Sequence, residues 1–263
     1  KAQAKSFVIR EKQISNDKAE IVFYFGQDSL YHPGVQFKLL NDERKVTVTR
    51  TNQGIHRTPF FNSYHQLEMY FETLEWNIDG EIIKMEPMFR SSNRRALFES
   101  LDYFKAYRFD DLYGLSHKHP LVILTNCAET YGNQLSTKDI ARCWGISESQ
   151  IKPYMMQLST QGYVSYDFDN NMVELKDKVG HYVKAKVQKE DYDIIEVNSD
   201  PPKDENASIN LNTMEMSVHG VRRMGLSDSH QVFIYPYGGE VVMKENRDFA
   251  FSGLVTAGRL EFY

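Results

Sequence analysis

Short runs of β-branched and aromatic residues, separated by turn-forming clusters about every ten residues, constrain the fold of this chain most strongly. They fill residues 1–60 and return in residues 191–263. Phenylalanine and tyrosine contribute 16 residues each, and such large side chains suit cross-strand pairs in a sheet. Regular short strands are typical of a β-sandwich or a β-solenoid, and the sequence does not choose between the two.

Local patterns add detail to these β-rich segments. Asp79-Gly80 is a strong two-residue turn signal and predicts a hairpin between residues 67–78 and 81–86. Residues 93–106 have apolar residues at helical spacing, so we expect a helix there whose solvated face carries Arg94 and Arg95.

Two polar clusters predict breaks between strands. His32-Pro33-Gly34 is expected to be a turn. Residues 198–206 contain no apolar residue over nine positions and are expected to form an exposed loop.

The middle of the chain changes to helical signals. Three helices are expected to begin at Pro120, after Ser136 and after Ser147, because proline suits a first helical position and serine caps a helix. A two-stranded hairpin is expected in residues 163–175, and a last amphipathic helix in residues 176–189.

These elements resemble a known family. With a small residue at Ala141, a glycine at Gly145 and an aliphatic residue at Ile151, residues 119–187 resemble the winged helix-turn-helix superfamily. The resemblance implies that the third helix enters a DNA major groove and that the hairpin, or wing, touches phosphate. The residues that would then contact nucleic acid or another partner are Ser149, Gln150, Lys152, Tyr154, Lys176 and Lys178.

The segments on either side resemble, more loosely, large uncharacterised bacterial proteins in which a helical module is inserted among β repeats. This resemblance rests on the residue types in 59–65 and 246–249, and it implies no activity. The final residues, 258–263, alternate like a strand, so we expect the chain to be an excerpt from a longer protein.

Charge argues against the DNA-binding use of such a module. The third helix, residues 147–161, has one base, Lys152, against one acid, Glu148, and the wing tip has Asp167 and Asp169 without a base. Phosphate contacts need Lys or Arg, and carboxylates repel the DNA backbone. We therefore expect packing or protein contact, and we keep DNA binding as the alternative.

The remaining residue types give few chemical signals. Phosphate-loop, dinucleotide, zinc-protease and serine-hydrolase motifs are missing, so we expect no enzyme, no metal and no cofactor. Cys127 and Cys143 are expected to be buried thiols in helices, which leaves the redox compartment open. His56 and His65 could be acid–base groups, although a structural or exposed role is expected.

Aromatic residues could also form a stacking platform for sugars or bases, although packing is the expected role. The residues considered are Tyr24, Tyr70, Phe71 and Trp76.

We therefore predict an α+β chain in which a winged-helix module is flanked by β-rich, sandwich- or solenoid-like segments. The expected domains are residues 1–114, 115–190 and 191–263, the last one truncated. The expected function is that of a non-enzymatic structural or protein-interaction region of a larger bacterial protein. The alternatives are a DNA-binding transcriptional regulator and an enzyme that acts on glycans.

The expected partners are other parts of the parent chain or a second protein, and nucleic acid is disfavoured. No apolar run approaches the ~18 residues that a membrane span needs. The cellular location stays open, with the cell envelope favoured over the cytoplasm.

Overall fold

The computed structural model describes residues 1–51, 54–88, 94–115, 118–190, 195–201, 205–227 and 231–262. The chain forms two compact units, which we name the β unit (Lys1–Leu101 with Ile194–Tyr263) and the helical unit (Asp102–Asp193). The divisions therefore fall after residues 101 and 193, whereas the expected domains divide after residues 114 and 190. The first and last segments belong to one unit.

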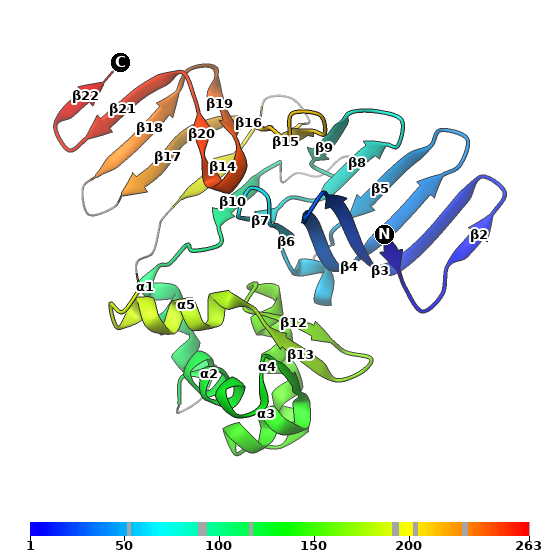
Figure 1. Cartoon of the computed structure of the whole chain (residues 1–263), viewed down its shortest axis with the longest axis vertical. Helices are drawn as coiled ribbons and strands as arrows, with labels where there is room; N and C mark the ends of the chain where they lie inside the picture. The colour runs from blue at the N-terminus through cyan, green and yellow to red at the C-terminus, as the bar shows by residue number, and fades with distance from the viewer. Residues whose placement is uncertain are drawn as a thin grey trace. The chain divides into compact units, whose positions relative to one another are not determined.

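The β unit is built on one antiparallel sheet that branches at a long strand, β4 (Asp28–Leu40). On one side β4 pairs with β3 (Gln13–Phe25), which in turn pairs with β1 (Ala2–Gln3) and β2 (Val8–Arg10). Along its other edge, β4 pairs first with β6 (Phe60–Asn62) and then with β5 (Lys45–Thr49), and each of these strands begins a series of neighbouring strands. We name the series that begins with β6 the first arm and the series that begins with β5 the second arm (Figure 1).

In spatial order, the first arm is β6 (Phe60–Asn62), β7 (Leu67–Tyr70), β10 (Ala96–Ser100), β14 (Glu196–Ser199), β17 (Val221–Ser227), β18 (Val232–Pro236), β21 (Gly253–Ala257) and β22 (Leu260–Phe262). The second arm is β5 (Lys45–Thr49), β8 (Thr73–Asn77), β9 (Ile82–Glu86), β15 (Ala207–Asn210), β16 (Met216–His219), β19 (Glu240–Met243) and β20 (Phe249–Ala250).

Between β6 and β21, successive hairpins lie alternately in the two arms. The hairpins β6–β7 and β17–β18 lie in the first arm, whereas β8–β9 and β15–β16 lie in the second. Alternate residues point inward, as in β9 and β15, and both arms contribute to one apolar core. Phe60, Met69 and Phe98 come from the first arm, and Leu74 and Met85 from the second.

A bend inside β4 allows one strand to serve both arms. Before the bend, Leu30 and Tyr31 pair with β6; after it, Gln36–Leu40 pair with β5. The bend contains His32-Pro33-Gly34, the predicted turn, so this prediction is wrong: the cluster bends a strand and does not end it. The register between β3 and β4 also shifts here, as bulges that bend a strand do.

The ring of His32 holds this bend. It is fully buried, its Nε2–H donates to the carbonyl oxygen of Thr58 at 2.8 Å, and its Nδ1 accepts the N–H of Gly34 at 3.0 Å. Burial lowers the pKa of His32 to about 3, so the ring is neutral at neutral pH.

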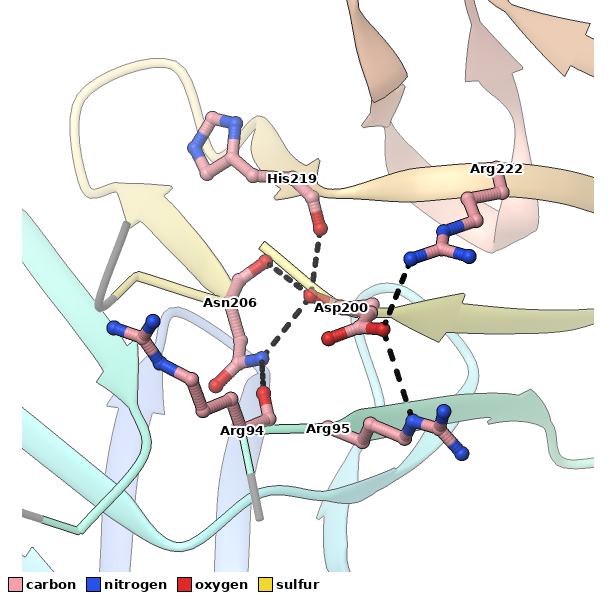
Figure 2. Close-up of polar contacts among 7 residues, drawn as sticks. Arg94, Arg95, Asp200, Asn206, His219 and Arg222 are labelled. Carbon is pink, nitrogen blue, oxygen red and sulfur yellow. Dashed lines mark hydrogen bonds and ion pairs between the residues drawn. The ribbon is translucent and has the colours of Figure 1, made fainter. Parts of the chain in front are cut away.

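A buried polar cluster connects the two arms at the start of β15. The Nδ2 of Asn206 donates to the carbonyl oxygen of Arg94 (2.8 Å) and to the Oγ of Ser199 (3.1 Å), which itself donates to the carbonyl oxygen of His219 (2.6 Å; Figure 2). The N–H of Asn206 donates to the carbonyl oxygen of Met85 at 2.8 Å.

This cluster corrects the prediction of an exposed loop in residues 198–206, of which 202–204 lie outside the described residues. Ser199 and Asn206 are 0% and 1% exposed. A run without apolar residues usually indicates solvated chain, but these polar side chains are buried because they satisfy each other and nearby backbone groups.

The helical unit is inserted at the position of a hairpin turn. β10 and β14 are paired neighbours in the first arm, from Ala96 opposite Ser199 to Glu99 opposite Glu196. The N–H of Ser100 continues the ladder to the carbonyl oxygen of Ile195 at 3.1 Å. Because the two points of attachment are adjacent, an independent unit fits between them without interrupting the sheet.

The helical unit has its own core and a small sheet in the order β11 (Gln134–Ser136), β13 (Met172–Leu175), β12 (Val164–Asp167). Its helices are α1 (Ala106–Asp111), α2 (Pro120–Tyr131), α3 (Thr137–Trp144), α4 (Glu148–Thr160) and α5 (Asp177–Lys186). The predicted helix starts at Pro120, Ser136 and Ser147 and the predicted hairpin are confirmed.

The predicted fold class, α+β with a winged-helix module between β-rich segments, is wrong. Strands make up 45% and helices 24%, with one large antiparallel sheet, so the fold is β-rich. The predicted helix in residues 93–106, of which 93 lies outside the described residues, contains strand β10 instead. Strands pair with β10 on both sides, and this pairing outweighs the helical spacing of its apolar residues.

We expect Asn206→Ala to destabilise the β unit by about 2 kcal/mol, because it removes two buried hydrogen bonds and leaves acceptors without a donor. Urea unfolding followed by Trp76 fluorescence in a Trp144→Phe background measures this, since the chain has 2 tryptophans, one in each unit. Asn198→Ala, an exposed asparagine on the same strand as Ser199, is the control. Equal effects of the two substitutions would contradict the role of Asn206.

We also expect the β unit to lose stability as the pH falls from about 6.5 towards 3. The unfolded chain binds a proton at His32 near its ordinary pKa, and the folded chain does so only near 3, so each pH unit in this window costs about 1.4 kcal/mol. His32→Gln should weaken this pH dependence in urea unfolding at pH 7 and pH 4.5, and His65, whose pKa burial lowers to about 4, accounts for part of what remains. An unchanged pH dependence in His32→Gln would contradict this role of the ring.

Candidate functional site

The six predicted contact residues all lie in the helical unit, on α4 or at the start of α5. Ser149 and Gln150 are exposed at the start of α4. The Oε1 of Gln150 accepts the N–H of Ser147 at 3.1 Å, and the Oγ atoms of Ser147 and Ser149 are 3.0 Å apart. These two residues therefore shape the N-terminus of the helix.

Lys152 and Tyr154 follow on the same helix. Lys152 is half-buried and is the single basic residue of α4. The ring of Tyr154 stacks on Trp144 with the ring centroids 5.4 Å apart, which fixes α4 against α3. The described helix thus presents one cation and no basic stripe.

Lys176 and Lys178 are engaged inside the unit. The Nζ of Lys176 lies 2.9 Å from the carboxylate of Glu174. Lys178 is 7% exposed; its Nζ donates to the carbonyl oxygen of Gln161 at 3.0 Å and lies 5.1 Å from the ring centroid of Tyr163. Because this ammonium is buried and donates to a backbone carbonyl, it is not available for direct contact with a phosphate.

The turn between β12 and β13 is acidic. Asp167 and Asp169 are both exposed, and Asp167 accepts the backbone N–H groups of Asp169 and Asn170 at 2.9 and 3.2 Å. The predicted contact surface of the helical unit therefore combines one cation on α4 with a negative turn.

The two cysteines form a disulfide, so the prediction of two thiols is wrong. Cys127 on α2 and Cys143 on α3 are bonded, with their Cα atoms 5.9 Å apart. Both lie in helices as predicted, but sequence spacing did not reveal that α2 and α3 pack side by side. A cleft of about 560 Å³ adjoins the bond, lined by His119, Tyr113 and Asn126 among others.

His119, in this cleft, has a structural role. Its Nδ1 accepts the N–H of Leu121 at 3.2 Å and caps α2, its Nε2–H donates to the carbonyl oxygen of Phe109 at 2.8 Å, and its ring stacks on Phe109. Burial lowers the pKa of His119, which keeps it neutral.

His65, considered as an acid–base group, is buried in the β unit. Its Nε2–H donates to the carbonyl oxygen of Met214 at 2.9 Å and its Nδ1 accepts the Nδ2–H of Asn62 at 2.9 Å. Burial lowers its pKa to about 4. Both ring nitrogens are used, so the ring joins the first arm to the β15–β16 turn.

Sequence reasoning missed two charged groupings in the β unit. Asp200 lies between the exposed guanidinium groups of Arg95 (3.8 Å) and Arg222 (3.4 Å; Figure 2). Glu68 and Glu99 are opposite each other on β7 and β10 and are each 1% exposed. Arg95 and Arg222 share one carboxylate, and Glu68 and Glu99 have interaction partners within the chain. We therefore assign both groupings a structural role in the sheet.

Sequence reasoning also missed an apolar pocket of about 820 Å³ in the β unit. Of the four aromatic residues considered as a platform, Tyr24 and Trp76 line it. Phe71 is in the core, stacked on Phe60, and the hydroxyl of Tyr70 donates to Glu68. The aromatic residues were the available signal, but their gathering depends on pairing between distant strands.

Comparison with protein-family models, with curated proteins and with solved structures gives no match for this chain. Within the described residues, no helix has the length and apolar character of a membrane-spanning segment.

We expect that replacing Cys127 and Cys143 with serine destabilises the helical unit by about 3 kcal/mol, because the bond closes a loop of 16 residues. Urea unfolding followed by Trp144 should shift to lower urea, whereas the Trp76 signal of the β unit should not. Reductant should reproduce this shift in the unmodified chain and have no effect on the variant. An unmodified chain that does not respond to reductant would contradict the disulfide.

Proposed function

We propose that this chain is a non-enzymatic structural or protein-interaction region, and that its helical unit contacts protein and not nucleic acid. The observation that carries the proposal is that basic side chains which a DNA contact would need interact with other residues of the helical unit instead. Lys178 is buried against Tyr163, and Lys176 is paired with Glu174.

Three further basic residues near α5 and α3 support the same proposal. Lys184 pairs with Glu190 at 2.9 Å and Lys186 with Asp110 at 2.6 Å, and Arg142 lies 3.4 Å from Asp139. Binding of DNA releases counterions only where cations are available to its phosphates. Cations that are already neutralised, together with an acidic turn, disfavour such binding.

The disulfide and the pockets also support the proposal. Disulfides persist in oxidising compartments such as the periplasm or the cell exterior, where a transcriptional regulator has no chromosome to bind. Neither the cleft beside the disulfide nor the apolar pocket is lined by a carboxylate, so neither offers the paired acids of a glycan hydrolase.

We expect no saturable binding of a mixed-sequence DNA duplex at low salt and up to about 10 µM protein, a range in which non-specific DNA binders respond. Fluorescence anisotropy of a labelled duplex measures this. The double variant Asp169→Lys with Glu174→Lys should gain salt-sensitive binding, because it reverses two charges around the turn and frees Lys176.

A matched control makes the same charge change in the β unit, at Asp42→Lys with Glu43→Lys in an exposed turn. It should bind DNA less tightly than the first double variant. Duplex binding by the unmodified chain that weakens with salt and with Lys152→Ala would overturn the proposal and favour the DNA-binding regulator.

A further inference from the structure

We infer that the apolar pocket of the β unit is a binding site for a small molecule with one long apolar chain. The inference does not depend on the helical unit, since residues of the β unit alone line the pocket. Its volume of about 820 Å³ lies in the range of small-molecule sites, roughly 300–1,000 Å³. The apolar residues that line it include Phe23, Phe37, Val46, Trp76, Ile83 and Met214.

The bend in β4 creates this pocket. The part of β3 that lines it pairs with β4 up to the start of the bend, from Phe25 opposite Asp28 to Ile21 opposite His32. Val46, Trp76 and Ile83 belong to the second arm, which pairs with β4 beyond the bend. The two walls therefore come from the two sides of the bend.

The walls and the floor are apolar and fixed. Ile21, Val46 and Ile83 are 2%, 7% and 1% exposed and belong to the core. Trp76 packs edge-to-face on Phe23 with ring centroids 5.9 Å apart, and its Nε1–H donates to the carbonyl oxygen of Gly80 at 3.1 Å. The one polar atom of the indole is thereby used, so the ring offers apolar surface.

The polar groups at the pocket limit what it can hold. Lys1 is the one charged residue among those lining it, and Tyr24, 64% exposed, adds a hydroxyl. A sugar or a base needs several hydrogen-bonding side chains, and an inserted peptide brings backbone groups that need partners. An apolar chain needs neither, and Lys1 can accept a single negative head group at the entrance.

The site is tested by titrating octanoate, decanoate, dodecanoate and tetradecanoate, each below its micelle concentration, into the full chain carrying Trp144→Phe. Trp76 fluorescence should change saturably, with affinity rising about fourfold per methylene until the pocket is filled. Calorimetry on the chain without this substitution gives the same affinities if Trp144→Phe impairs the helical unit.

The matching primary alcohols distinguish the two kinds of head group. Tighter binding of the acids means that Lys1 receives a carboxylate, and equal binding means that the chain alone is recognised. Both results support the site, whereas affinities that do not change with chain length overturn it.

Two matched variants separate binding in the pocket from adsorption elsewhere. Ala2 lines the pocket, and Ala4, equally half-buried against the same core, does not. Ala2→Phe should reduce dodecanoate affinity at least tenfold, and Ala4→Phe should leave it unchanged. Equal affinities of the two variants, at unchanged urea midpoints, would overturn the inference.

Discussion

The bend at His32 in β4 is the constraint on which the β unit depends. Along one edge, an antiparallel strand normally pairs with one neighbour. Here the change of direction lets the same edge of β4 pair with β6 on one side of the bend and with β5 on the other. The neutral ring of His32 fixes it with two hydrogen bonds. From this point the hairpins alternate between the arms and enclose one core, and the pocket lies between β3 and the second arm.

Local signals in the sequence were enough for most elements. Caps and turn residues gave the starts of α2, α3 and α4, and Asp-Gly gave the β8–β9 hairpin. The pairing of the strands could not be predicted, because β10 meets β14 only after the whole helical unit has been inserted. Burial of Asn206 and bonding of Cys127 to Cys143 likewise depend on which elements pack together, and local composition does not contain that information.

The candidate sites were predictable to different degrees. The residue types alone predict the acidic turn at Asp167 and Asp169 and the single cation of α4. The contacts of Lys176 with Glu174 and of Lys178 with Gln161 could not be predicted, because they depend on how the chain folds. The pocket was visible only as an excess of aromatic residues. We therefore propose separate uses for the two units, a surface for protein contact on the helical unit and an apolar binding site in the β unit.

Hydrogen–deuterium exchange on the full chain, with and without dodecanoate, tests most directly the claim that the bend opens a binding site between β3 and the second arm. The account predicts slower exchange in residues 20–26 and 73–78, which hold the two walls, and no change in residues 118–187 of the helical unit. Protection confined to the helical unit, or no protection of either wall at saturating ligand, would contradict it.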